Sequence, residues 1–128
     1  MTTQNPKVML VEDDVALVKM YSSKLKKDGY TVLTAFTGDE ALNLIQKDKP
    51  DIILLDIMLP DIPGLQVLEK VKRTNKLKDI PVLILTVLPE IIALKKAIKL
   101  GAEGYLIKSE NTPETVSRYV KEELNKFK

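Results

Sequence analysis

The sequence alternates between short, continuously apolar runs and longer segments in which apolar residues recur every three or four positions. The runs Val8–Val11, Ile52–Leu55 and Val82–Leu85 contain only apolar residues. Such runs are typical of strands covered on both faces, as in a parallel sheet. Strands are predicted over Lys7–Val11, Tyr30–Ala35, Ile52–Asp56, Val82–Thr86 and Gly104–Ile107. The second contains two threonines and is more mixed, so we expect it at an edge of the sheet.

The segments between the strands have the period of amphipathic helices. One apolar face of Asp14–Asp28 is formed by Leu17, Val18, Tyr21 and Leu25. One face of Pro113–Phe127 is formed by Val116, Tyr119, Val120, Leu124 and Phe127. Before the last strand, Ile91, Leu94 and Ile98 form a stripe that we expect to face the core, whereas Ile92 lies off it and is expected to be exposed.

Residues that favour helix ends mark the limits of these helices. Expected ends are Asp28-Gly29, Lys49-Pro50 and Leu100-Gly101, and expected starts are Thr37-Gly38 and Thr112-Pro113. The regular alternation of strands and helices predicts an α/β fold built from right-handed β–α–β units. We expect one domain over residues 1–128, with residues 1–6 as a flexible tail.

The predicted architecture is a doubly wound, five-stranded parallel sheet with five helices on both faces. The strand order 2-1-3-4-5 is taken from known flavodoxin-like folds of this class rather than worked out from the residues. In that order the first and third strands are neighbours, at the point where the winding reverses. Their carboxyl ends therefore meet at one edge of the sheet.

Acidic residues stand at these two strand ends. Glu12 and Asp13 follow the first run, and Asp56 follows Ile52–Leu55. Three carboxylates this close repel one another and are costly to desolvate, so packing alone does not explain them. A hard cation such as Mg²⁺ would neutralise them, because it prefers oxygen ligands and needs only one or two carboxylates plus water or phosphate.

Two further polar residues, Thr86 and Lys108, end the fourth and fifth strands at the same edge. A carboxylate nucleophile, a metal site, a hydroxyl and an ammonium group together suit phosphoryl transfer to an oxygen. Each residue alone has an ordinary interpretation, such as a helix-starting acid or a surface lysine. Their joint placement at strand ends is what favours a function.

The motifs around these positions, in this order, resemble one known family. They are Val11-Glu12-Asp13-Asp14, Leu55-Asp56-Ile57-Met58-Leu59-Pro60 with Gly64, Leu85-Thr86, Gly101-Ala102 and Tyr105-Leu106-Ile107-Lys108. The chain resembles the response-regulator receiver domains of two-component signalling, and is similar to the single-domain chemotaxis receiver, from about Lys7 to Phe127.

The resemblance implies a role for each site residue. Asp56 would accept a phosphoryl group from a sensor histidine kinase or a phosphotransfer protein. Asp13, Asp56 and the backbone carbonyl of Met58 would ligate Mg²⁺ (or Mn²⁺), with Glu12 acting through a bound water. Lys108 would pair with Asp56 and then with the phosphoryl oxygens.

The resemblance also implies a switch. Thr86 would donate its hydroxyl to the new phosphoryl group, and Tyr105 would turn inward as Thr86 moves. The face made by the fourth helix, fifth strand and fifth helix would then change its binding of a downstream protein target. We expect such a protein to be no ordinary enzyme, and to be a monomer or a weak phosphorylation-dependent dimer.

Two positions depart from the family pattern. Ser109 stands where a proline usually follows the lysine, often after a cis bond. Because a non-proline cis peptide costs about 2.5–4 kcal/mol, we expect a trans bond and a reshaped loop from Ser109 to Thr112. Val87 stands where a small residue usually follows Thr86. Its side chain should obstruct attacking water and slow the loss of phosphate.

Composition narrows the function classes. The 128 residues carry a net charge of +2 and include no Cys and no His. Disulfides, thiolate zinc sites and His general bases are therefore excluded, and a histidine donor must belong to another molecule. The scattered lysines give no reason to expect direct nucleic-acid binding. The start lacks a secretion signal, and no apolar stretch suits a membrane span, so a cytoplasmic protein is expected.

Two other functions compete with the switch. An aspartyl phosphatase of the haloacid-dehalogenase type would need a second Asp two positions after its nucleophile, where this chain has Met58. A degenerate receiver acting as an unphosphorylated binding scaffold is the alternative that Ser109 and Val87 allow.

No linker follows the last helix, which ends at Lys126-Phe127-Lys128. We therefore expect a complete chain rather than a piece of a longer regulator.

Overall fold

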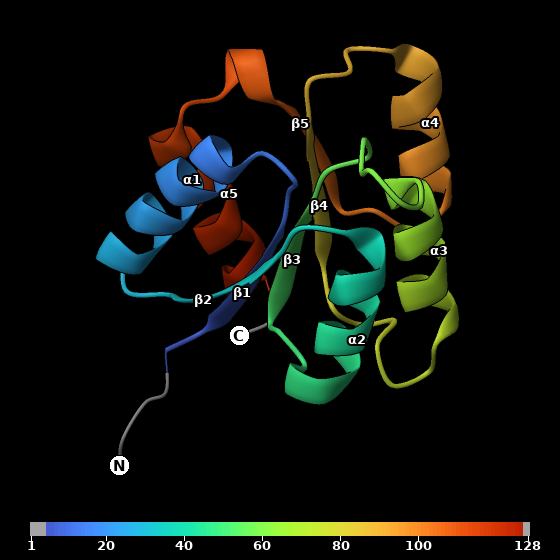
Figure 1. Ribbon diagram of the computed structural model, residues 1–128, viewed down its shortest axis with the longest axis horizontal. Coiled ribbons are helices and arrows are strands. Elements are labelled where there is room, and N and C mark those ends of the chain that lie inside the picture. Colours follow the sequence, from blue (N-terminus) through green and yellow to red (C-terminus); the bar gives the residue numbers. More distant parts are fainter. Residues whose placement is uncertain (1–4, 127–128) are drawn as a thin grey trace.

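The computed structural model describes residues 5–126, in which strands and helices alternate (Figure 1). The elements are β1 Lys7–Val11, α1 Val15–Lys27, β2 Thr31–Ala35, α2 Gly38–Asp48, β3 Ile52–Leu55, α3 Gly64–Arg73, β4 Val82–Thr86, α4 Ile91–Lys99, β5 Gly104–Ile107 and α5 Pro113–Asn125, with a 3₁₀ turn at Lys108–Glu110 before α5. The predicted strands agree to within one residue, since β2 begins at Thr31 and β3 ends at Leu55. Most of the tail predicted for residues 1–6 lies outside the described residues, and Pro6 accepts a backbone hydrogen bond from Thr31.

The five strands form one parallel sheet in the order β2-β1-β3-β4-β5. This order confirms the predicted fold class and places β2 at an edge. Strand β1 pairs with β3 so that Val11 lies opposite Leu55. Just beyond this pair, the Asp56 N–H donates to the Val11 carbonyl at 3.1 Å. The register therefore brings the residues that follow β1 and β3 side by side.

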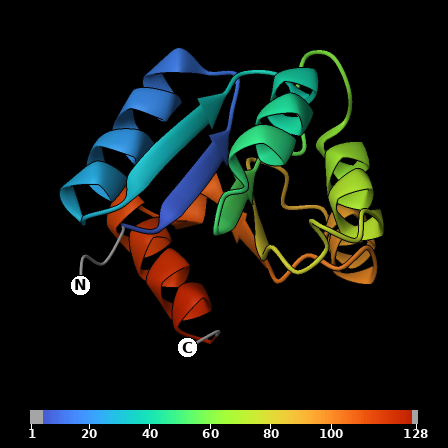
Figure 2. The same ribbon diagram turned by 90° about the horizontal axis from the view of Figure 1, so that it is seen from below.

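Helices cover both faces of the sheet (Figures 1 and 2). Helices α1 and α5 pack on one face with Leu10 and Leu54, and α2, α3 and α4 pack on the other with Met9 and Ile53. Alternate residues of each central strand thus enter two different cores. This explains why these strands are apolar at every position.

The helix ends lie where the sequence places them. The side chains of Asp14, Thr37 and Thr112 each accept a backbone N–H from the first turn of α1, α2 and α5. Gly29 and Gly101 follow α1 and α4 with positive φ angles of 98° and 105°, a conformation that glycine adopts without steric cost. In the described part of the chain no helix is long and apolar enough to cross a membrane.

The prediction that Ile91, Leu94 and Ile98 of α4 face the core is wrong. Ile91 and Ile98 are 63% and 50% exposed, and Leu94 is only partly buried. The helix packs on the molecule through Ala93 and Ala97, one turn apart. These small side chains let α4 lie close to the sheet, and that orientation turns the larger stripe outward. Ile92 is exposed, as predicted.

A smaller correction concerns α5. Val116 and Val120 are fully buried, but Tyr119 is exposed although it was expected on the buried face. Val116 and Val120 lie one helical turn apart on the buried face, whereas Tyr119 lies beside that face and points its ring toward solvent. Phe127, also assigned to that face, lies outside the described residues.

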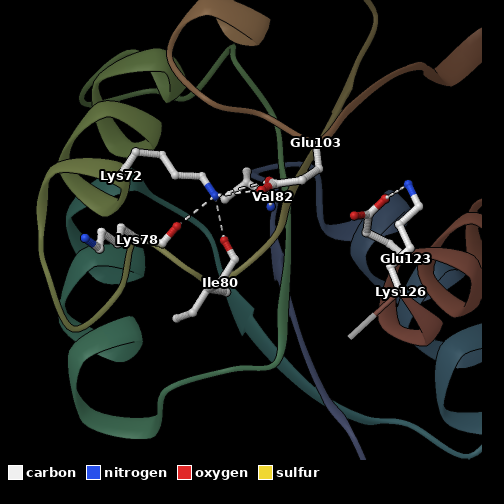
Figure 3. Close-up of polar contacts among 7 residues, drawn as sticks. All are labelled: Lys72, Lys78, Ile80, Val82, Glu103, Glu123 and Lys126. Carbon is white, nitrogen blue, oxygen red and sulfur yellow. Dashed lines mark hydrogen bonds and ion pairs between the residues drawn. The ribbon is translucent and has the colours of Figure 1, made fainter. Parts of the chain in front are cut away.

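A polar network joins α3 to the starts of β4 and β5 (Figure 3). The ammonium of Lys72 donates to the Lys78 carbonyl at 3.2 Å, to the Ile80 carbonyl at 2.9 Å and to Glu103 at 3.0 Å. Glu103 in turn accepts the Val82 N–H at 2.7 Å. The Lys72 side chain thus joins helix α3 to two loops, the one between α3 and β4 and the one between α4 and β5, at the end of the sheet opposite Glu12 and Asp56.

Candidate functional site

Three carboxylates meet at the carboxyl edge of the sheet. Glu12 and Asp13 follow β1, Asp56 follows β3, and one oxygen from each residue lies within 4.8 Å of the others. Glu12 and Asp56 are only 2% and 4% exposed, whereas Asp13 faces solvent. The expected meeting of these residues is confirmed. Solvent can reach the cluster from the side of Asp13.

Lys108 provides the positive charge of the site. It follows β5, and its Nζ donates to Asp56 Oδ2 at 2.8 Å and to Glu12 Oε1. Burial alone would lower the pKa of Lys108, but these two hydrogen bonds outweigh burial and raise it, so the side chain stays charged. Burial has the opposite effect on Glu12 and raises the pKa of its carboxyl. The hydrogen bond from Lys108, which Glu12 shares with Asp56, only partly offsets this effect.

Local backbone contacts fix the carboxylates. Asp56 Oδ1 accepts the Met58 N–H at 3.0 Å, and Glu12 Oε2 accepts the Asp14 N–H at 3.0 Å. The loop after Asp56 is held by Gly64, whose N–H donates to the Ile57 carbonyl at 2.7 Å. A Cβ at Gly64 would lie 2.1 Å from the Asp56 carbonyl oxygen. Only glycine fits this close approach, so the loop and Asp56 keep their places.

The donor set suits a hard divalent cation. Three carboxylates and one ammonium leave the cluster with two negative charges, and carboxylate oxygens with access to water are what Mg²⁺ binds. The backbone carbonyl of Met58 makes no hydrogen bond in the described part of the chain, and its role as a ligand stays a prediction.

Thr86 and Tyr105 are linked through a backbone group that the sequence does not reveal. Thr86 is fully buried at the end of β4, opposite Ile107, which precedes Lys108. Its Oγ1 accepts the Leu88 N–H at 3.4 Å, and the Tyr105 hydroxyl donates to the Leu88 carbonyl at 2.8 Å. Because both contacts use the main chain of Leu88, no side-chain pattern could have predicted them.

The two departures from the family pattern surround Lys108. Residues 5–126 contain no cis peptide bond, as expected with Ser109, and Lys108–Glu110 form a 3₁₀ turn. Asn111 supports this turn through an Nδ2 donor to the Ile107 carbonyl at 2.9 Å. With serine at position 109, Lys108 therefore still contacts Asp56.

Val87 is 53% exposed and lines a cavity of about 530 Å³ together with Lys108 and the buried Tyr21.

Comparisons with known proteins agree with this geometry. The family model of the response regulator receiver domain matches residues 8–120. A probable transcriptional regulator, ycf27 of Guillardia theta, is 34% identical over 112 residues. The match covers 88% of this chain but 43% of that regulator, so this chain spans less than half of the relative's length.

Solved structures show the same relationship. The CheY-like receiver domain protein of Methanospirillum hungatei is 26% identical with a TM-score of 0.89, covering 95% of both chains. The chemotaxis response regulator CheY4 of Vibrio cholerae is 31% identical with a TM-score of 0.85, covering 92% of this chain and 98% of that one. With a family match over most of its length, this chain belongs to the response regulator receiver domains.

Proposed function

We propose that this chain is a phospho-accepting switch that takes a phosphoryl group onto Asp56 from a sensor histidine kinase or a phosphotransfer protein. Receiver domains are generally signalling switches that interact with histidine kinases and downstream targets. The observation that carries the proposal is the contact of Asp56 with Lys108 beside two further carboxylates. Such a site offers a nucleophile, a cation for the phosphoryl oxygens and ligands for Mg²⁺ (or Mn²⁺).

The transfer step needs no general base. The ionised carboxylate of Asp56 attacks phosphorus, and an acyl phosphate forms as the phosphorus–nitrogen bond of the donor imidazole breaks. The electron pair of that bond stays on the imidazole nitrogen. A bound Mg²⁺ would supply charge neutralisation for the phosphoryl oxygens. Its ligands would be Asp13, Asp56 and the Met58 carbonyl, with Glu12 acting through water.

Lys108 would exchange partners during the reaction. Its ammonium holds Asp56 before transfer and would move to a phosphoryl oxygen afterwards, while Glu12 continues to hold it. The raised pKa of Lys108 keeps it charged at neutral pH, so it can stabilise the charge that develops in the transition state.

Thr86 and Tyr105 would carry the signal to the surface. If the Thr86 hydroxyl turns to the phosphoryl group, the Leu88 N–H loses its acceptor and the loop between β4 and α4 changes. Tyr105 would then exchange its hydrogen bond with the Leu88 carbonyl for an inward position. Phosphorylation would then shift the population of the chain toward a second conformation of the face made by α4, β5 and α5. A downstream protein would bind the two conformations of this face with different affinity.

Intact mass spectrometry tests this function. The chain is incubated with Mg²⁺ and a small acyl phosphate, and we expect the mass to rise by one phosphoryl group. The adduct should be absent from Asp56→Asn and present in Asp79→Asn, an exposed aspartate away from the site. No adduct on the wild type would favour the unphosphorylated scaffold. An adduct that survives in Asp56→Asn would show that another residue is the acceptor.

A further inference from the structure

A cavity of about 680 Å³ lies at the end of the sheet opposite Glu12 and Asp56. Its walls come from the segments in which β1, β3 and β4 begin, at the lower end of the sheet in Figure 1, and from α5. A volume of this size is ordinary for a site that binds a small molecule. The phosphoryl transfer proposed above uses none of the residues that line it.

Three lysines from separate parts of the chain line this cavity. Lys7 begins β1, Lys49 follows α2, and Lys76 lies in the loop between α3 and β4. None of the three forms an ion pair in residues 5–126. The Lys7 ammonium has only a long contact of 3.4 Å with the Asp48 carbonyl. The wall of the cavity therefore carries three lysines whose charge no carboxylate neutralises at ion-pair distance.

Two aspartates, Asp51 and Asp79, also line the cavity, so its charge is not uniformly positive. Asp51 Oδ2 accepts the Lys7 N–H at 2.7 Å, and the Asp51 N–H donates to the Lys7 carbonyl at 2.8 Å. These two bonds fix the Asp51 carboxylate in the wall. A ligand that suits this wall has anionic groups for the lysines and hydrogen-bond donors, such as hydroxyls, for the carboxylates.

The backbone of Lys49 is an independent sign that its side chain has a use. Lys49 is the one non-glycine residue of the described chain with a positive φ, at 42°, and this conformation costs free energy for a residue with a Cβ. Just after α1 and α4, glycines 29 and 101 hold such positions. Attraction to the negative end of α2 does not explain the lysine, because Lys47 already lies in the last turn. A lysine at this strained position is explained if its side chain meets an anion in the cavity.

The rest of the wall is mainly apolar. Pro50 and Pro81 are buried, and Ile80 and Leu124 are partly buried. Proline has no N–H to donate, so this part of the wall offers apolar contact and little to a bare anion. Inorganic phosphate would use the lysines alone, whereas a ligand that also carries a ring would use both parts of the wall.

We propose that this cavity binds a small phosphorylated metabolite of nucleotide size. Its phosphate groups lie on the three lysines, its hydroxyl groups donate to the two aspartates, and its ring lies against the two buried prolines. The site is at the opposite end of the sheet from Asp56. The inference goes beyond the proposed phosphoryl transfer and does not rest on it.

Fluorescence anisotropy of labelled ADP tests the ligand chemistry. The titration is made in chelator, so that no divalent ion bridges the phosphates to Glu12, Asp13 or Asp56. We expect saturable binding that added salt weakens. Unlabelled ADP should displace the probe, whereas adenosine, inorganic pyrophosphate and citrate should each need at least about tenfold higher concentrations.

Matched lysine variants locate the site. Lys49→Gly and Lys76→Gln should each weaken ADP binding by about tenfold, because a charged donor to phosphate is lost. Lys47→Gln and Lys78→Gln remove the same charge from exposed neighbours that do not line the cavity. These two controls should stay within about twofold of the wild type, since salt screens charges outside the site.

The variant Lys49→Gly separates binding from folding. Glycine adopts the left-handed conformation without steric cost, so this variant should melt at or above the wild type while it binds ADP more weakly. It should also take the phosphoryl group on Asp56 as the wild type does, as measured by intact mass. A lysine that serves stability alone would give the reverse, a lower melting temperature with unchanged ADP binding.

Several outcomes would overturn the inference. They are no saturable binding of labelled ADP and unchanged binding in both Lys49→Gly and Lys76→Gln. Displacement by pyrophosphate or citrate as effective as that by ADP would show a site for simple anions, and equal displacement by adenosine would show that the lysines take no part. A chain that binds ADP but takes no phosphoryl group on Asp56 would defeat the switch and leave this inference standing.

Discussion

Lys108 serves two carboxylates at once, and this sharing shapes the chemistry of the site. Its ammonium contacts both Glu12 and Asp56, while Asp13 makes no ion pair in the described part of the chain. The cluster therefore remains negative even with Lys108 in place. That remaining charge favours cation binding. It also allows Lys108 to leave Asp56 without becoming unpaired, since Glu12 retains it.

Val87 should control the lifetime of the phosphorylated state. Its exposed side chain follows Thr86 and lines the cavity beside Lys108, and we expect it to obstruct a water that attacks the phosphoryl group on Asp56. We predict that Val87→Ala loses phosphate several-fold faster than the wild type, because the smaller side chain opens this path. The decay of the phosphorylated mass after donor removal measures the rate. Val15→Ala, also exposed, should decay as the wild type does, and an unchanged or slower rate in Val87→Ala would refute the obstruction.

The limits of sequence reasoning at this scale are specific. Glu12, Asp13, Asp56 and Lys108 could be placed because strand ends in a parallel sheet share an edge. The link from Thr86 to Tyr105 through Leu88 could not, since it depends on the path of the main chain after β4.

Helix α3 is fastened by Lys72, whose ammonium binds two carbonyls and Glu103. We predict that Lys72→Met lowers the free energy of unfolding by about 1–3 kcal/mol, because the partly buried Ile80 carbonyl and the more exposed Lys78 carbonyl and Glu103 all lose their donor. Urea denaturation measures the change. Arg73→Met is the matched control, since its pair with Glu69 is exposed at 3.5 Å and such pairs contribute about 0–1 kcal/mol. Equal losses in both variants would mean that the Lys72 network adds no stability of its own.

Helix α2 is capped from a distance by Asp61, which lies in the loop after β3. Its carboxylate accepts the N–H groups of Asp39 at 2.9 Å and Gly38 at 2.8 Å, and these bonds lower the pKa of Asp61. A lowered folded pKa gives stability that is present above the unfolded pKa of about 3.9 and is lost as pH falls through the folded pKa.

The pH dependence of Asp61→Asn follows from this sign. We predict that the variant melts below the wild type at pH 7 and that the difference shrinks as the pH falls below about 4. Thermal unfolding followed by circular dichroism checks this. The same comparison with Asp79→Asn, whose carboxylate accepts no hydrogen bond in residues 5–126, corrects for general charge effects. A difference that does not change with pH would argue against the ionised cap.

The sequence predicts where helices and strands begin and end more accurately than it predicts which side of a helix faces the sheet. Capping residues such as Thr37 and Thr112 fixed helix starts because their hydrogen bonds are local. The orientation of α4 could not be predicted from period alone. Its Ala93 and Ala97 pack closely on the sheet, and a stripe of isoleucines looks the same in sequence whether it faces the core or a partner.

The order of the strands in the sheet determines where the candidate site lies. The reversal of winding between β1 and β3 brings together residues more than forty positions apart in sequence. Apolar runs and helix periods predicted the doubly wound class, whereas the strand order needed knowledge of existing folds. Once that order is given, Glu12 and Asp56 must be neighbours, because β1 and β3 pair in register.

The most direct test of this account is a calorimetric titration of Mg²⁺ into the wild-type chain, Asp13→Asn, Asp56→Asn and the control Asp79→Asn. If one ion is shared by the ends of β1 and β3, the wild type and the control will bind a single Mg²⁺. Each site variant will then bind it at least about tenfold more weakly, since a charged ligand is lost. Wild-type affinity in either Asp13→Asn or Asp56→Asn would contradict a shared ion and, with it, the site proposed for phosphoryl transfer.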